Sequence, residues 1–335
     1  MWALKKIVTL GVIYMCTKHR RMVSSFEIVK CHGSGNDFIL VDTTRDSMLS
    51  AVDWSAFARV ACSRTEGIGS DGVLLVVRDE RGYYGMDMLN PDGTHAQMCG
   101  NGIRAVARMA AERGYLGEGV LFSGGRDFKV AHESPIAYDI ATFSVEIPIE
   151  RWSDSFAFFR EGESFVGRPI KELHADICFT ALSLGNPHLV ARVERIDMEL
   201  LKSWGEAVIG LRELFPEGVN VSMYEVLSPT KIFVATYERG AGITLSCGTA
   251  MTASATAAAL LGYVENGERI EVINRGGKVF CTPRIGDTIV TRLEGNATFE
   301  WWGEATFGDG HFSYSKQRVT GEQEQWQRFV KDINR

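Results

Sequence analysis

The sequence lacks the patterns that mark disulfide-rich and metal-binding proteins. Its cysteines are odd in number and none forms a C-x-x-C pair, and its histidines stand singly, without a carboxylate at i, i+4. These absences argue against a disulfide framework and against a structural zinc site, so we expect no bound metal. Unpaired thiols are typical of a reducing compartment, which predicts a cytoplasmic protein. The seven cysteines are Cys16, Cys31, Cys62, Cys99, Cys178, Cys247 and Cys281.

Basic charge and long apolar runs are scarce as well. The formal net charge is −6 and the pI is near 5.7, which gives no reason to expect a nucleic-acid partner. The apolar stretch Ile7–Cys16 is too short to span a membrane, so no membrane association is expected. A basic cluster follows it instead of a small-residue cleavage site. We therefore interpret residues 1–24 as an N-terminal extension and favour Met22 as the start of translation, with a targeting segment as the alternative.

The stretch QMCGNGIRAVARMAAERGY, residues 97–115, predicts a helix that begins directly after a cysteine. From Ile103 onward, apolar residues recur at i, i+3, i+4, i+7 and i+8, which places Arg104, Arg108 and Glu112 on the solvent face. Unpaired N–H groups and the helix dipole favour a thiolate or a bound anion at such a helix start. On its own the motif fits an inert, buried Cys99 better than a functional one.

A second copy of this motif, LSCGTAMTASATAAALLGY, occupies residues 245–263. Gly114 and Gly262 follow their cysteines at the same distance, and Asn90 and Glu238 precede them at the same distance. Farther upstream, Gly-Asn pairs end at Asn36 and Asn186, again at nearly equal distances from Cys99 and Cys247. Landmarks repeated in one order indicate two copies of a single α/β unit.

The expected fold is α+β, with two pseudo-symmetric α/β domains. Short strand-like runs separated by turns predict a mixed or antiparallel sheet wrapped around one central helix in each domain, with the active site in the cleft between them. We expect the first domain over residues 25–149 and the second over 150–308, whose last strands could pack on the first domain. Residues 309–335 are expected to form a polar C-terminal tail, either a short helix or a frayed end.

Two thiols on opposite sides of one carbon suit a racemase or epimerase that needs no cofactor. One thiolate removes the α-proton and the other thiol protonates the opposite face. Two converging helix starts would stabilise the charge that develops on the substrate carboxylate, and the same dipoles are expected to lower the thiol pKa toward the working pH.

Six motif blocks resemble, in order, those of the diaminopimelate epimerase family. They are FEIVKCHGSGNDFILVD, RTEGIGSDGVLLV, NPDGTHAQMCGNGIRAVAR, SLGNPHLV, FPEGVNVSMYEV and YERGAGITLSCGTA, and they cover about Phe26 to Gly308. The resemblance implies interconversion of L,L- and meso-diaminopimelate without pyridoxal or another cofactor, serving lysine and peptidoglycan synthesis. It implies diaminopimelate as the small-molecule partner and leaves the oligomeric state open, with a homodimer as one alternative.

The resemblance also implies roles for individual residues. Cys99 and Cys247 match the two catalytic bases. The residues that match the helix starts holding the reacting carboxylate are Gly100, Asn101, Gly248 and Thr249. Those that match the groups holding the substrate, mostly at its distal end, are Asn36, Asn90, Asn186, Asn220, Glu238 and Arg239. His188, beside a Gly-Asn block, is assigned a supporting role, with a purely structural role as the alternative.

The chain departs from the family pattern at three positions. Ile243 replaces the second Glu of E-R-G-x-G-E-T, Ala250 replaces the last Gly of C-G-T-G, and Ala105 replaces a third cysteine. Ile243 and Ala250 flank Cys247, which leaves its pKa and the substrate preference open. A racemase of another amino acid, such as proline, and a non-catalytic amino-acid-binding or thiol-redox protein are the competing hypotheses.

The segment GIGSDG, residues 67–72, spells a dinucleotide-binding fingerprint. That fingerprint requires a strand before it and a helix after it, whereas a strand-like run, VLLVV, follows here. We therefore interpret it as a turn-rich loop near the substrate.

Overall fold

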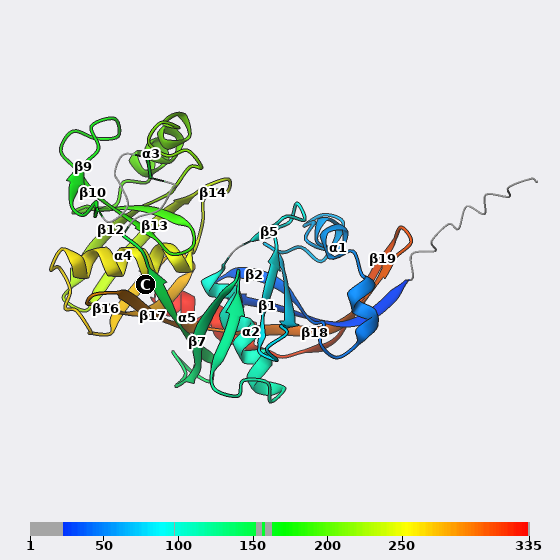
Figure 1. The fold of residues 1–335 in the computed structure, drawn as a ribbon. Coiled ribbons are helices and arrows are strands. Elements are labelled where there is room, and N and C mark those ends of the chain that lie inside the picture. The colour runs from blue at the N-terminus through cyan, green and yellow to red at the C-terminus, as the bar shows by residue number, and fades with distance from the viewer. Residues whose placement is uncertain (1–22, 97, 152–155, 158–162, 334–335) are drawn as a thin grey trace, which may run out of the picture.

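The chain folds into two successive units with the same order of strands and helices (Figure 1). The computed structural model describes residues 23–96, 98–151, 156–157 and 163–333. The predicted N-terminal extension therefore lies almost wholly outside the described residues and stays a prediction. The first unit consists of β1 (Ser24–Gly33), β2 (Asn36–Asp42), a 3-10 helix (Ser47–Ala51), α1 (Trp54–Ala61), β3 (Val73–Arg78), β4 (Tyr84–Leu89), β5 (His95–Ala96), α2 (Gly100–Glu112), β6 (Val120–Ser123), β7 (Arg126–Glu133) and β8 (Thr142–Ile149).

After an added short strand, β9, the second unit repeats this order of strands and α-helices, and the 3-10 helix has no counterpart among its described residues. It consists of β9 (Arg168–Pro169), β10 (Cys178–Ser183), β11 (Pro187–Arg192), α3 (Met198–Gly210), β12 (Asn220–Ser228), β13 (Lys231–Glu238), β14 (Gly242–Ile243), α4 (Gly248–Leu260), β15 (Ile270–Asn274), β16 (Gly277–Ile285) and β17 (Ile289–Asn296). The chain ends in β18 (Thr298–Gly308), β19 (His311–Val319) and α5 (Glu322–Ile333).

Strand pairing shows the internal repeat directly. β1 and β2 are antiparallel, β2 and β3 parallel, β3 and β4 antiparallel, and β4 and β6 parallel. In the second unit β10, β11, β12, β13 and β15 pair in the same sequence of directions. Each parallel pair needs a crossover connection, which α1 and α2 supply in the first unit and α3 and α4 in the second. The predicted α+β fold built from two copies of one unit is confirmed.

Long strands join the two units to each other. β17 of the second unit pairs antiparallel with β8 of the first over their full length, and β18 then pairs antiparallel with β1. Figure 1 shows β18 and β19 running along the first unit, away from the rest of the second. The last strands therefore tie the second unit to the first.

The central helices α2 and α4 are enclosed by strands. In α4 every residue from Gly248 to Ala258 is buried, as expected for a helix that is small and apolar on all sides. In α2 the prediction of a wet face is wrong for Arg104, which has no exposed surface. Strands of both units, including β1, β8 and β17, cover the helix, so this face is closed to solvent at Arg104 and opens only toward Glu112.

The C-terminal residues form an exposed strand and a docked helix. β19 pairs with β18 and is exposed along most of its length, whereas α5 buries Trp326 and Phe329. Helix α5 packs on β18 and β16. Within the described part of the chain, no helix has the length and apolar character needed to cross a membrane.

Candidate active site

The two motif cysteines begin the two central helices, as predicted. Cys99 is the N-cap of α2, and the Gly102 N–H donates to its Sγ at 3.4 Å. Cys247 is the N-cap of α4, and its Sγ lies 3.4 Å from the hydroxyl of Thr249. Each thiol is thus placed where unpaired backbone N–H groups point away from a helix end.

The two helix starts meet face to face. A Cβ on Gly248 would lie 2.8 Å from Asn101 Oδ1, and one on Gly100 would lie 3.0 Å from a methyl of Leu293, which also borders Gly248. A side chain at position 248 would collide with Asn101 of the other helix, so glycine there allows the close approach of the two first turns. The structure therefore brings together the predicted carboxylate-binding residues of both units.

Asn36 connects the first thiol to a residue that sequence reasoning missed. Its Oδ1 accepts from Asn101 Nδ2 at 3.2 Å and from the Cys99 thiol at 3.8 Å, while its Nδ2 donates to Asp71 Oδ2 at 2.7 Å. Arg64 in turn donates to Asp71 Oδ1 at 2.7 Å. Asp71 fixes which end of the Asn36 amide faces Cys99. It lies in the GIGSDG segment, which the sequence analysis interprets as a loop near the substrate. That interpretation is the signal from which Asp71 could have been identified.

Asn186 holds the equivalent place in the second unit. Its Nδ2 donates to the Thr249 hydroxyl at 3.4 Å, and His188 Nε2 lies 3.1 Å from its Oδ1. Burial lowers the pKa of His188 to about 3, so the ring is neutral and donates its Nε2–H to Asn186. The Nδ1 of His188 has no hydrogen-bond partner among the described residues.

Glu238, Arg239 and Asn220 gather at the end of β13. The Arg239 N–H donates to Asn220 Oδ1 at 2.9 Å, and its guanidinium donates to the Glu217 carbonyl at 2.6 Å. Glu238 accepts from the Thr244 hydroxyl at 2.5 Å. Burial raises the pKa of Glu238, and the hydrogen bonds from Thr244 and Cys247 oppose that rise.

Burial dominates the electrostatics of both thiols. It raises the pKa of Cys99, although the N–H groups of Gly102 and Asn101 and the charge of Arg104 lower it. Burial likewise raises the pKa of Cys247 well above its usual value, and the charge of Glu238 raises it further. The expectation that the helix starts bring the thiol pKa down is therefore wrong as a net effect: the N–H groups act in that direction, but burial outweighs them.

Asn90 stands apart from the other predicted residues. It begins the turn between β4 and β5, where its Nδ2 donates to the Thr94 hydroxyl at 3.0 Å. The hydrogen bonds of the described residues do not join it to either thiol or to the other predicted groups.

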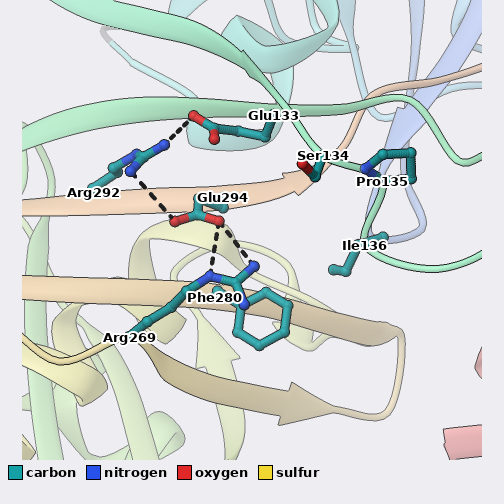
Figure 2. Close-up of a pocket in the computed structure, with 8 residues that line it drawn as sticks. All are labelled: Glu133, Ser134, Pro135, Ile136, Arg269, Phe280, Arg292 and Glu294. Carbon is teal, nitrogen blue, oxygen red and sulfur yellow. Dashed lines mark hydrogen bonds and ion pairs between the residues drawn. The ribbon is translucent and has the colours of Figure 1, made fainter.

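Two open grooves of the described residues lie away from both thiols. One, of about 420 Å³, is lined by Glu133, Arg269, Arg292 and Glu294, and Figure 2 shows Glu294 held between the two arginines. Arg269 binds Glu294 at 2.9 Å and Arg292 binds Glu133, so these charges neutralise one another. By contrast, Cys247 lines a small enclosed cavity of about 10 Å³, room for about one water molecule. Among the described side chains, no three His, Cys, Asp or Glu groups gather as metal ligands.

Solved structures share this fold at low sequence identity. The hydroxyproline epimerase from Agrobacterium vitis matches with a TM-score of 0.60 and 13% identity, covering 87% of this chain and 94% of that one. A phenazine biosynthesis protein of the PhzF family from Bacillus anthracis matches with a TM-score of 0.58 and 13% identity, covering 84% and 99%. The chain thus shares its two-unit fold with these proteins. In this chain a thiol stands at the start of each central helix.

Sequence comparison is more specific. The family model described as diaminopimelate epimerase matches residues 28–139 and 180–300. The diaminopimelate epimerase of Listeria innocua is 34% identical over 93% of this chain and 98% of its own length, and that of Ligilactobacillus salivarius is 36% identical over 92% and 100%. The chain belongs to the diaminopimelate epimerase family, a family of amino-acid isomerases, and the resemblance found in the motif blocks is confirmed.

Proposed function

We propose that this chain interconverts L,L- and meso-diaminopimelate by a two-base mechanism in which Cys99 and Cys247 face opposite sides of the substrate α-carbon. In each direction one cysteine, as thiolate, takes the α-proton and the other, as thiol, donates its own proton to the opposite face. The observation that carries this proposal is the pair of thiols at the N-caps of α2 and α4, whose first turns meet at Gly248 and Asn101.

The helix starts would bind the reacting carboxylate. The N–H groups of Gly100, Asn101, Gly248 and Thr249 belong to the first turns of α2 and α4, where intrahelical acceptors are missing. When the α-proton leaves, negative charge spreads onto that carboxylate, and fixed N–H donors stabilise it without reorganisation. Each donor of this kind is worth on the order of 3 kcal/mol in enzymes of other folds.

The second amino-acid end of diaminopimelate gives a role to the remaining polar residues. Glu238 and Arg239 supply one anion and one cation, and Asn36, Asn90, Asn186 and Asn220 supply amides that both donate and accept. Asn186 is oriented by His188, which we assign a supporting role. A racemase of a simple amino acid has no use for such a distal cradle, which is why we favour a substrate with two amino-acid ends.

The chemistry also indicates the cellular compartment in which the enzyme works. Both bases must stay reduced to carry protons, and thiols persist in this form in a reducing compartment. We infer a cytoplasmic enzyme of lysine and peptidoglycan precursor synthesis, and a homodimer stays a prediction.

A turnover assay tests the proposal. Reduced protein is incubated with pure L,L-diaminopimelate and no cofactor, and isomers are resolved by chiral chromatography. Wild type should form the meso isomer, Cys99→Ala and Cys247→Ala should not, and Cys178→Ala, which removes an exposed thiol outside the site, should match wild type. Failure of wild type on diaminopimelate together with racemisation of proline would replace our proposal with the competing one.

A further inference from the structure

Arg104 is a fully buried cation whose contacts are all neutral. Its guanidinium donates to the Gly100 carbonyl at 2.9 Å, to Asn101 Oδ1 at 3.0 Å and to the Asn296 carbonyl at 3.3 Å. In the part of the chain that the structure describes, no carboxylate lies within ion-pair distance of it. Arg108, one turn farther along α2, instead pairs with Glu112 and Glu322.

The surrounding backbone is shaped to hold this group. A Cβ on Gly33 or on Gly295 would lie 2.9 Å from Arg104 Nη2, so β1 and β17 each carry glycine where they approach the guanidinium. Burial lowers the pKa of Arg104 to about 10, which still leaves it charged at neutral pH. A buried charge without a partner is costly. An anion that forms nearby during function would offset this cost.

The groups that face this charge identify the anion. Cys99 from the start of α2 and Cys281 from β16 are the titratable groups that interact with Arg104. Cys281 is fully buried in the core beside Thr252, whereas Cys99 is half-buried and its thiol donates to Asn36 Oδ1. Cys99 is also joined to Arg104 by a chain of hydrogen bonds that passes through Asn101 and Asn36.

We propose that Arg104 is a positioning residue that supplies the permanent counter-charge for the anions formed at the start of α2. These anions are the Cys99 thiolate and, on the proposed function, the substrate carboxylate bound to the same helix turn. Arg104 also holds Asn101 Oδ1, which turns Asn101 Nδ2 toward Asn36 and keeps the acceptor of the Cys99 thiol in place.

Alkylation of Cys99 tests the charge without relying on the substrate. Iodoacetamide labelling of the native protein is followed by peptide mass spectrometry from pH 6 to 10. In Arg104→Met the labelling profile should move up by about one pH unit, a tenfold loss of rate at neutral pH. Arg108→Met removes a cation that is already compensated, and its Cys99 profile should match wild type. An unshifted profile in folded Arg104→Met protein would overturn the proposal.

A second variant neutralises the charge without removing Arg104. Cys281→Asp places a carboxylate beside the guanidinium, and Cys281→Asn is its uncharged match. The Asp variant should shift the Cys99 profile upward as Arg104→Met does, and the Asn variant should not. Equal profiles in both would contradict a role for the charge, even if Arg104→Met fails to fold.

Turnover completes the test. If wild type epimerises diaminopimelate, kcat should fall in Arg104→Met by about tenfold or more, and the acidic limb of its pH profile should move upward with the labelling profile. Absence of turnover in wild type would remove the proposed function but would leave the labelling result to decide the role of Arg104.

Discussion

At the scale of single residues, the site depends on amides whose orientation is fixed by neighbours. Asn36 must present oxygen to Cys99 and Asn101, and it does so because Asp71 can accept only from its nitrogen. Asn101 is fixed in the same way by Arg104, and Asn186 by His188. Each thiol is thus next to a short series of hydrogen-bonded polar side chains.

Replacing Asp71 tests this dependence. In Asp71→Ala the Asn36 amide is free to turn, so kcat/KM for diaminopimelate should fall by about five- to thirtyfold, the cost of one misplaced hydrogen bond of about 1–2 kcal/mol. Steady-state kinetics with Asp79→Ala as the control measures this, because Asp79 lies on an exposed hairpin and binds Arg81. Wild-type kinetics in Asp71→Ala would show that Asn36 needs no orienting partner.

The same scale shows what sequence patterns can and cannot predict. The Cys-Gly pairs predicted both helix starts, because a glycine after an N-cap thiol reflects a close approach that the structure confirms at Gly248. The burial of Arg104 was not predictable from helical periodicity, since the periodicity of α2 does not show that strands from both units cover it. The high pKa of both thiols depends on burial in three dimensions and escaped prediction for the same reason.

At the scale of elements, α5 is connected to the first unit by hydrogen bonds to α2 and β1. Glu322 accepts from Arg108 of α2 and from the Phe299 N–H, and Gln323 lies 2.7 Å from His32 Nε2. His32 Nδ1 in turn accepts from the Gly35 N–H in the turn that carries Asn36. The turn is therefore connected to α5 through His32. The polar sequence of α5 did not predict this connection.

Trp326 anchors this helix. It is buried against Gly277, where an added Cβ would lie 2.6 Å from its ring, and against His32. Trp326→Ala should lower the free energy of unfolding by about 3–5 kcal/mol through lost burial and the cavity left behind. Urea unfolding followed by circular dichroism measures the effect.

Tyr314→Ala, an exposed aromatic of β19, serves as the control and should change stability little. A Trp326→Ala protein as stable as the control would mean that α5 is only loosely docked.

At the scale of the whole molecule, folding buries two histidines in their neutral form. Burial lowers the pKa of His32 to about 4 and that of His188 to about 3. The unfolded chain, with ordinary values near 6.5, binds protons that the folded chain does not. Stability is therefore unaffected by these groups above pH 7 and falls as the pH drops from about 6.5 toward 4.

The expected slope is about 1.4 kcal/mol per pH unit for each histidine within that window. Unfolding free energies measured by urea titration between pH 7 and 4 should show it. The slope should be smaller by about 1.4 kcal/mol per pH unit in His32→Gln. It should stay close to that of wild type in His311→Gln, whose ring is exposed. Equal slopes in wild type and His32→Gln would contradict a neutral, buried His32.

The two-unit architecture explains why a chemistry of two bases fits this chain. Duplication places one thiol at the start of each central helix, and β8–β17 and β1–β18 pairing sets the two units against each other. The repeat was readable from equally spaced landmarks in the sequence. The pairing of β18 with β1 determines how the two sets of landmarks lie relative to each other. This pairing joins residues far apart in the chain, so the sequence did not predict its register.

Deuterium exchange tests the central claim, one thiol on each face of the α-carbon, most directly. L,L-diaminopimelate is incubated with the enzyme in D₂O, and product and recovered substrate are separated before the reaction approaches equilibrium. Two bases predict deuterium at the inverted α-carbon of the meso product, while recovered L,L substrate keeps its α-proton. Deuterium entering recovered substrate as fast as product would point to a single base serving both faces and would contradict the account.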